Sequence, residues 1–504
     1  MSDNSSFENK PQRRSFILVA LMLTMMLAAM DSTIVSTAIP HIVSDLGGFT
    51  KFSWVFSIYL LAQTVTIPVY GKLTDLFGRK KVLILGINIF LIGSAASAAS
   101  WNIGSLIFFR GMQGLGAGSI MATVNTIAGD IYTVEERAKI QGYLSSIWGI
   151  SAIVGPALGG ALAEYVNWRW IFLINLPIGA VSIYFITSFF KEHIVPVKPV
   201  IDYKGSVLIL LTLALLFIFL LEGGQAWSWF SYESFGILFI VLFLAVWTVN
   251  TERKTSDAIM PAWLWKNKTL AFTNLAMAGM GIVMMGPETF LPTFAQTSLG
   301  IGTIASGFIL ASMSLGWPTS SALSGKIYMR IGFRDTSIIG AVIVLLAFTG
   351  FLLIPRPQPV YLLVCDQVLL GAGFGLLSTP SLVGIQSMVS WQQRGVVTSA
   401  NMFSRNLGQS LGAAIIGAIF NNSFLQQMKN APSDIPAVIK DIIGTFNSPD
   451  LADTSKEFLR GAINTSMHNV YWGLILFTLI IILCLYIVPQ RSAKDNTLID
   501  TGSK

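Results

Sequence analysis

The segment GKLTDLFGRKK, residues 71–81, joins two long apolar stretches, each long enough to cross a lipid bilayer. A connection this short must leave and re-enter the membrane on the same side. Its basic side chains (Lys72, Arg79, Lys80 and Lys81) indicate the side, because Lys and Arg are enriched in cytoplasmic loops. We therefore interpret the segment as a cytoplasmic hinge between two transmembrane helices.

Composition places the whole chain in the same class. Apolar residues make up 53% of the 504 positions and charged residues only 11%, and the mean hydropathy is +0.67, which is far from soluble-protein averages. The net charge of +7 would suit nucleic-acid binding only if the basic residues were gathered on one face, but they lie in loops between apolar stretches. We predict a polytopic protein in contact with the lipid bilayer and without a nucleic-acid partner.

Apolar runs of about 18 or more residues predict fourteen transmembrane helices. The predicted helices begin near Phe16, Trp54, Val82, Gly104, Ile140, Ile171, Gly205, Tyr232, Thr269, Thr303, Thr336, Val360, Val396 and Val470. An even number returns the C-terminus to the side of the N-terminus. Alternate loops then place most of the Lys and Arg residues on the cytoplasmic side, which supports the helix count and the orientation.

The two halves of the chain resemble each other at an offset of about 255 residues, which indicates homologous halves. The repeated pairs are Gly71 with Gly325, Gly78 with Gly332, Gly114 with Gly371 and Gly155 with Gly412. We predict an all-α fold of two six-helix bundles, residues 16–192 and 269–489, joined by a linker, residues 193–268, that contains two additional transmembrane helices. Residues 1–15 and 490–504 are predicted cytoplasmic ends, and residues 421–469 a long extracellular loop. In such parallel halves the substrate site lies between the bundles near mid-membrane.

Several motifs resemble one family. The hinge pattern Gly-x-x-x-Asp-x-x-Gly-Arg-Lys resembles the cytoplasmic loop signature of the major facilitator superfamily. The segments MDSTIVSTAIP (30–40), RGMQG (110–114) and WRWIFLINLPIG (168–179) are similar to motifs of its fourteen-span drug:proton antiporters. The resemblance covers nearly the whole chain, and it implies multidrug export driven by proton influx, although family members also export other amphiphiles and metabolites.

The sequence favours a transporter over an enzyme. It contains no Gly-x4-Gly-Lys-Ser/Thr loop to hold a nucleotide phosphate, and its three histidines lack the carboxylate neighbours of a metal site. We predict no cofactor and the proton gradient as energy source. The expected function is an antiporter that exports lipophilic, cationic or zwitterionic drugs by alternating access, as a monomer in a bacterial plasma membrane. A facilitator for a metabolite, sugar or other amphiphile is the alternative.

Ionisable side chains within predicted transmembrane helices are functional candidates, because burying a charge in the bilayer is costly. Asp31 and Glu288 lie in the first helix of each half, and we predict that both face one central cavity and bind proton and substrate in turn. Asp366 is a third candidate, and a polar network that locks helices together is the alternative for each acid. Arg110 belongs to the motif that the resemblance links to proton transfer, and a fixed ion pair is its alternative. A packing role is equally consistent with Arg405.

A second group of residues is predicted to form a cytoplasmic gate: Gly71, Asp75, Gly78, Arg79 and Arg137. Asp75 can accept hydrogen bonds from a helix N-terminus or pair with Arg79 or Arg137, and so hold the two halves together while the cavity faces outward. The repeat places Met329 at the position equivalent to Asp75. We therefore expect a latch on one side only.

The fifth predicted helix carries Gly149, Gly155, Pro156, Gly159 and Gly160. Small residues let helices approach closely, and a proline permits a bend. The resemblance to antiporters implies that this helix also closes the leak between the two sides, with simple packing as the alternative.

The predicted extracellular loop, residues 421–469, has apolar residues at helical spacing in 435–446 and 458–463. This pattern indicates short amphipathic helices that either cover the outer mouth or form a passive, solvated loop.

Overall fold

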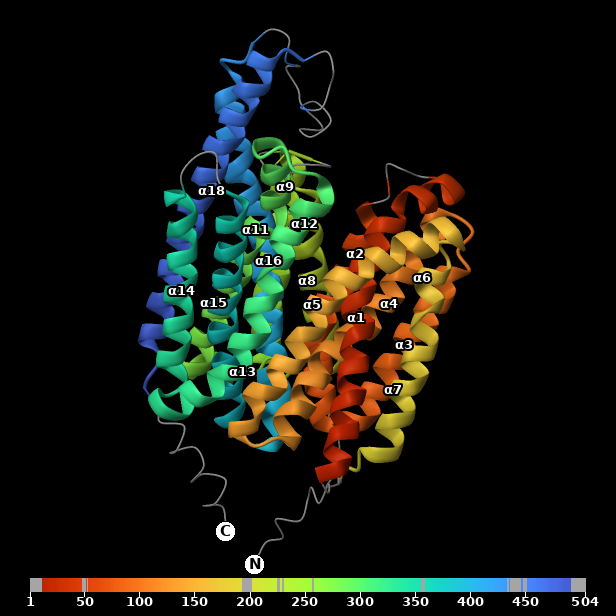
Figure 1. Ribbon diagram of the computed structural model, residues 1–504. Helices are drawn as coiled ribbons and strands as arrows, with labels where there is room; N and C mark the ends of the chain where they lie inside the picture. The colour runs from red at the N-terminus through yellow and green to blue at the C-terminus, as the bar shows by residue number, and fades with distance from the viewer. Residues whose placement is uncertain are drawn as a thin grey trace, which may run out of the picture.

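The computed structural model describes residues 11–47, 51, 53–192, 202–223, 227–228, 231–255, 258–354, 359–432, 435, 446 and 451–490. The described part is built of helices, which form two bundles that stand side by side (Figure 1). The all-α fold predicted from hydropathy is confirmed.

The N-terminal bundle contains α1 (Pro11–Leu46), α2 (Ser53–Phe77), α3 (Arg79–Ala98), α4 (Ile103–Ile131), α5 (Val134–Tyr165), α6 (Trp170–Leu173) and α7 (Asn175–Phe189). The C-terminal bundle contains α11 (Lys268–Ser298), α12 (Thr303–Ala311), α13 (Met313–Ile331), α14 (Phe333–Leu353), α15 (Val360–Ser387), α16 (Trp391–Met428) and α18 (Asp453–Ile487), preceded by the short α10 (Ala262–Lys266). Each bundle has its own apolar core, as expected for two homologous halves.

Every predicted transmembrane segment corresponds to one helix or to a closely spaced pair, α6 with α7 or α12 with α13. Eleven membrane-spanning candidates in the described residues satisfy both length and hydropathy. The segments that fall short are α4, α12 with α13, and α16. These segments meet the other bundle, because α13 packs on α5 and α16 packs on α2 and α4. Helices at this junction carry polar side chains that replace lipid contacts with contacts between bundles, which lowers their hydropathy.

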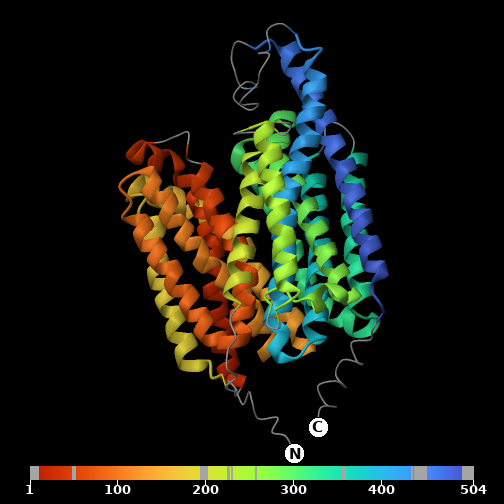
Figure 2. The ribbon, with the colours of Figure 1, turned by 180° about the vertical axis from the view of Figure 1, so that it is seen from behind.

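The inserted helices are α8 (Tyr203–Glu222) and α9 (Tyr232–Glu252). Helix α8 packs against both α2 and α16, whereas α9 packs mainly on α8. Seen from behind, the pair covers one side of the junction between the bundles (Figure 2).

Several helices extend past the bounds predicted for their transmembrane segments. Helix α1 begins at Pro11, inside the predicted polar end. Helix α16 continues to Met428 and α18 begins at Asp453, so both extend into the predicted loop 421–469 and project beyond the other helices (Figure 1). Polar residues in these extensions hid their continuity from a hydropathy count. Residues 458–463 belong to α18 and form no separate helix, and most of 435–446 lies outside the described residues, as do 1–10, 193–201 and 491–504.

The first helix begins and the last helix ends on the same side of the molecule, which we call the terminal side (Figure 1). On this side Gly78 precedes α3 and Gly332 precedes α14, each with φ of 91°. Side chains other than glycine rarely adopt this conformation. The repeated glycines thus allow the same turn in both bundles.

Candidate functional site

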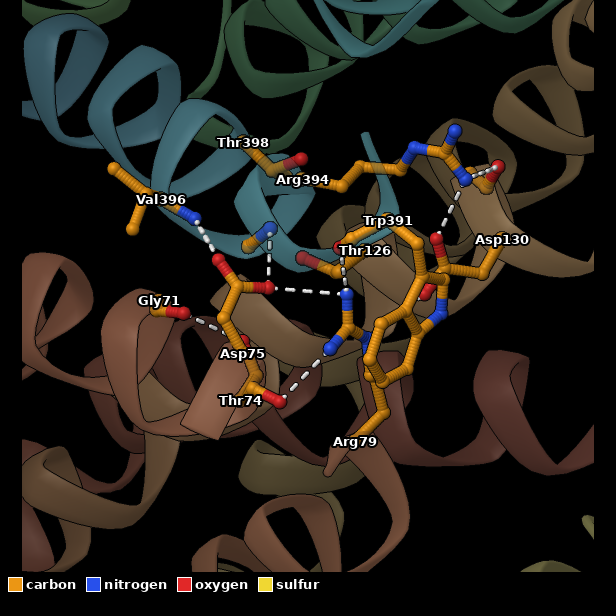
Figure 3. Close-up of polar contacts among 12 residues, drawn as sticks. Gly71, Thr74, Asp75, Arg79, Thr126, Asp130, Trp391, Arg394, Val396 and Thr398 are labelled. Carbon is orange, nitrogen blue, oxygen red and sulfur yellow. Dashed lines mark hydrogen bonds and ion pairs between the residues drawn. The ribbon is translucent and has the colours of Figure 1, made fainter. Parts of the chain in front are cut away.

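On the terminal side, the carboxylate of Asp75 joins the two bundles (Figure 3). Its Oδ1 accepts a hydrogen bond from the backbone N–H of Gly395 and its Oδ2 one from Val396, both at 3.0 Å. Asp75 lies in the last turn of α2, and its partners lie near the start of α16. A carboxylate at this position also interacts favourably with the positive end of the helix dipole.

Arg79 is the centre of the same cluster. Its guanidinium is 1% exposed and pairs with Asp75 at 3.0 Å and with Asp130 at 2.8 Å. It also donates to the backbone carbonyl of Trp391 at 2.5 Å and lies 3.6 Å from the centre of the Trp391 ring. A buried cation is tolerated because two carboxylates compensate its charge.

Arg394 completes this arrangement from α16. Its Nη1 lies 2.7 Å from Oδ1 of Asp130 and donates to the carbonyl of Gly129 at 3.2 Å. We call Asp75, Arg79, Asp130, Trp391 and Arg394 the latch. Its members come from α2, α3, α4 and α16, so opening the terminal side must break contacts between oppositely charged groups.

A second contact joins the two bundles, between α13 and α5. The Tyr328 hydroxyl on α13 donates a hydrogen bond to the backbone carbonyl of Val134 at the start of α5. Nearby on α5, Arg137 donates to the Tyr132 carbonyl at 3.0 Å and interacts electrostatically with Tyr328. The residue before Met329 thus supplies a neutral donor where the acid is missing, so the charged latch lies at Asp75 and this hydrogen bond adds to it.

A polar layer lies next to the latch, toward the middle of the molecule. Gln386 on α15 donates to the carbonyl of Asn125 at 3.2 Å and to the hydroxyl of Thr398 at 2.9 Å. Gln141 on α5 donates to the Asn125 side chain at 3.2 Å. Since these residues come from both bundles, the terminal side is closed by more than the charged latch.

Asp31 lies inside the N-terminal bundle, with no exposed surface. It forms an ion pair with Arg110 of α4, and its Oδ1 accepts from Gln113 at 2.7 Å and Asn175 at 3.4 Å. The Arg110 guanidinium also lies 4.2 Å from the centre of the Tyr59 ring. The acid is thus enclosed by side chains of its own bundle, and a central cavity shared with Glu288 stays a prediction.

Glu288 lies on α11 of the C-terminal bundle and has a different arginine. It is half-buried on α11 and interacts electrostatically with Arg405 of α16. Met402 and Asn406 share a face of α16 next to Arg405, and they contact Asn125 and Thr64 of the N-terminal bundle at 3.6 and 3.4 Å. The pair therefore involves the helix of the C-terminal bundle that packs on α2 and α4.

The repeat explains the relation between these pairs. An offset of 257 residues relates Gly114 to Gly371, and it also relates Asp31 to Glu288 and Arg110 to Gln367. The second half retains the acid of its first helix, whereas its arginine lies on α16. The packing role considered for Arg405 overlooked this electrostatic partner.

Asp366 occupies a third position, inside the C-terminal bundle. It is 7% exposed and accepts a hydrogen bond from Gln367 at 3.3 Å. A Cβ atom added at Gly350 of α14 would lie 3.7 Å from its Oδ1. The carboxyl group therefore faces α14, within its own bundle.

The glycines of α5 separate into distinct environments. A Cβ atom added at Gly149 would lie 2.7 Å from the Cβ atom of Ser314, and one added at Gly159 would lie 2.9 Å from Cγ1 of Ile34. At Gly160 an added Cβ atom would meet nothing within 4 Å. Gly155 packs closely against Thr33 of α1. Gly149 therefore lets α5 approach α13 of the other bundle closely, and Gly155 and Gly159 let α1 pack closely on α5. Pro156 lies inside the same helix.

Sequence reasoning missed Asp130, Trp391, Arg394 and Asn175. Arg394 had a signal, since it lies 257 residues after Arg137, and Asn175 belongs to the quoted segment 168–179. Nothing in the sequence pointed to Asp130 or Trp391, because their partners are distant along the chain.

Two helical bundles that meet across a charged latch, with acid–arginine pairs buried among their helices, define a membrane transporter built from paired halves. The chain belongs to the Major Facilitator Superfamily, whose family model matches residues 21–413. It is 30% identical to the multidrug transporter protein MdtP of Bacillus subtilis, with 97% of each chain covered. It is 33% identical to Multidrug resistance protein 3 of the same organism, covering 90% of this chain and 88% of that one.

Solved structures agree with this fold. The human organic anion transporter MFSD10 superposes with a TM-score of 0.62 at 15% identity, covering 95% of this chain and all of that one. The proton:xylose symporter XylE gives a TM-score of 0.63 at 12% identity, covering 97% of this chain and 99% of that one. At these identities the likeness concerns the fold alone.

Proposed function

We propose that the protein is a proton-coupled antiporter that exports lipophilic, cationic or zwitterionic drugs from the cytoplasm by alternating access. The observation that carries this proposal is the acid Glu288 on α11 opposite Arg405 on α16, the helix that packs on α2 and α4 of the N-terminal bundle. The names of the two Bacillus relatives support drugs as the class of substrate. The basic hinge 71–81 supports a plasma-membrane orientation in which the terminal side faces the cytoplasm.

The chemistry follows from competition for one negative charge. An ionised Glu288 attracts a cationic drug, whereas a protonated Glu288 does not, and a low-dielectric site strengthens this difference. Proton binding from outside would release the drug, and loss of the proton toward the cytoplasm would restore the charge. We propose that Asp31, Arg110 and Asp366 contribute to the coupling from within the bundles, where all three are buried.

The latch provides the other requirement, alternation between two states. Hydrogen bonds to charged groups contribute about 1.5–3 kcal/mol each, so opening the terminal side requires compensation from bound drug or proton. One proton moving down a potential of about 100 mV supplies about 2.3 kcal/mol, and each pH unit adds about 1.4 kcal/mol. Each such contact is thus comparable in magnitude to the free energy that one proton supplies.

The test is transport by the purified protein in lipid vesicles with an internal pH indicator. Ethidium or a fluoroquinolone should cause proton movement, whereas a neutral sugar should not. Glu288→Gln should abolish the drug-dependent signal, and Glu233→Gln, the same change at the exposed start of α9, should leave it unchanged. Full proton-coupled efflux by Glu288→Gln would refute the assignment of Glu288. Movement of the sugar without protons would favour the facilitator alternative.

A further inference from the structure

We propose that Glu192, at the end of the N-terminal bundle, is a positioning residue for the latch: its carboxylate holds the start of α3, and with it Arg79, in the place where the latch forms. This inference rests on the proposed alternation between two states. It goes beyond that proposal because it names a residue outside the latch that determines whether the terminal side stays closed.

Both oxygens of the Glu192 carboxylate bind the start of α3. Oε1 accepts a hydrogen bond from the backbone N–H of Arg79 at 2.8 Å, and Oε2 accepts one from the backbone N–H of Lys80 at 3.0 Å. The first amides of a helix have no partner within the helix, and a carboxylate interacts favourably with the positive end of the helix dipole. Glu192 therefore fixes the first turn of α3, although it lies 113 residues after Arg79 in the chain.

Arg79 is held at two points. It is the first residue of α3, so Glu192 binds its backbone, while its guanidinium donates to the carbonyl of Thr74 at 3.0 Å and lies among the latch residues. Its partners in the latch lie on three other helices, α2, α4 and α16. If the start of α3 shifted, the guanidinium would have to leave these partners. Holding the backbone amide of Arg79 therefore also holds its ion pairs.

A second contact joins the same two segments in the opposite direction. Nζ of Lys80 donates hydrogen bonds to the carbonyls of Thr187 at 2.8 Å and Phe190 at 2.7 Å, at the end of α7. A cation is favourable there because the last carbonyls of a helix carry partial negative charge. The start of α3 and the end of α7 therefore form one unit, from which Glu192 reaches the backbone of Arg79.

The start of α14 repeats the basic contact. An offset of 254 residues relates Lys80 to Arg334, as it relates Gly78 to Gly332. Arg334 donates to the carbonyl directly after the end of α18 at 3.4 Å, as Lys80 does to the carbonyl directly after the end of α7. The basic contact thus secures the same turn in both bundles, whether or not the helix begins with a charged residue.

The residue equivalent to Glu192 behaves differently. Gln490 occupies this position in the second half, two residues beyond the carbonyl that the basic side chain binds. Its Nε2 donates to Oδ2 of Asp335 at 2.8 Å. Helix α14 begins with Phe333, the counterpart of Arg79. A carboxylate therefore occupies this position in the half whose helix begins with the latch arginine, as expected of a residue that positions Arg79.

The experiment measures how fast a water-soluble maleimide labels Gln141→Cys, in a background with Cys365→Ser and Cys484→Ser. Gln141 is buried in the polar layer next to the latch, so labelling reports opening of the terminal side. Glu192→Ala frees the start of α3, and we expect labelling to be at least fivefold faster. Gln490→Ala is the matched control, since it removes the equivalent side chain from the other bundle, and labelling should stay within twofold. Glu192→Gln keeps one acceptor oxygen and should lie between the two.

Combining Glu192→Ala with Asp75→Asn distinguishes a positioning residue from a helix cap that acts on stability alone. Where Asp75 no longer holds Arg79, a shift of Arg79 has little left to break, so Glu192→Ala should then speed labelling by less than twofold. A cap that acts on stability alone would lower the thermal unfolding temperature by the same amount in both backgrounds, without this dependence of labelling on Asp75.

The outcomes separate this inference from the proposed function. If Asp75→Asn leaves labelling unchanged, the latch does not close the terminal side, and the proposed alternation at this contact fails together with the inference. If Asp75→Asn speeds labelling but Glu192→Ala behaves like Gln490→Ala, the inference alone is overturned. An equal effect of Glu192→Ala with and without Asp75 would also overturn it, because Glu192 would then act independently of the latch. If Glu192→Ala does not fold, Glu192→Gln is compared with Gln490→Ala in the same way.

Discussion

Oδ1 of Asp75 lies 3.0 Å from the backbone nitrogen of Gly395, although 320 residues separate the two along the chain. The contact joins the end of α2 to the start of α16, so a charge in one bundle is held by the backbone of the other. It depends on close approach, because a Cβ atom at Gly395 would lie 2.5 Å from the Gly71 carbonyl oxygen. Closure of the terminal side therefore needs an acid on one helix and glycines on both.

The role of the Asp75 charge in closing the terminal side can be tested by Asp75→Asn. The amide keeps the shape of the side chain but loses the charge that holds Arg79 and the start of α16. We expect transport to fall about tenfold or more, because one charged contact is worth at least about 1.4 kcal/mol, and we expect drug affinity to change little. Vesicle transport and equilibrium drug binding measure the two effects. Loss of binding in a normally folded variant would show that Asp75 belongs to the drug site.

The close approach of the helices at Gly395 can be tested by Gly395→Ala. The added methyl would also lie 2.7 Å from Oδ1 of Asp75, and such overpacking costs typically 1–3 kcal/mol. We expect a terminal side that stays open, seen as about tenfold faster labelling of Gln141→Cys in a background with Cys365→Ser and Cys484→Ser. Gly417→Ala is the control, because its Cβ would meet nothing within 4 Å. Equal labelling of both variants would argue against closure at this contact.

Neighbouring glycines in α5 should behave differently. Gly159→Ala forces a methyl group against Ile34 of α1, whereas Gly160→Ala does not meet any neighbour within 4 Å. We expect the first change to lower the thermal unfolding temperature and transport, and the second to have little effect or to stabilise the helix slightly. Thermal unfolding in detergent compares them directly. A harmful Gly160→Ala would mean that this position acts in a state other than the one described.

The buried Asp31–Arg110 pair should show strong coupling between its members. Asp31→Asn leaves the Arg110 charge without its partner in a site with no exposure, and breaking a buried pair in this way typically costs about 3–5 kcal/mol. The double variant Asp31→Asn with Arg110→Gln removes both charges, so we expect it to be more stable than either single variant. Thermal unfolding of the four proteins measures this. Additive losses would show that the two charges do not depend on each other.

Much of the candidate site followed from the sequence because its signals are local. Asp75 and Arg79 belong to one short charged hinge, and Asp31, Arg110 and Glu288 are ionisable residues in apolar stretches. Such residues are recognisable in any transmembrane segment, because placing a charged side chain in the bilayer is costly. The repeat added the relation between the halves, and it contained the signals for Arg394 and for the equivalence of Asp31 with Glu288.

The sequence by itself determined the helices, the two homologous halves and the residues that carry charge into the membrane, because hydropathy and residue spacing are properties of neighbouring positions. The tertiary structure alone decided which charges meet. Asp130 and Trp391 belong to the latch, and Asp31 is enclosed by Arg110, Gln113 and Asn175. Glu288 interacts electrostatically with Arg405. All these partners are far apart in the chain. Which side chains become partners depends on how helices pack and rotate against one another, and a single sequence does not record that geometry.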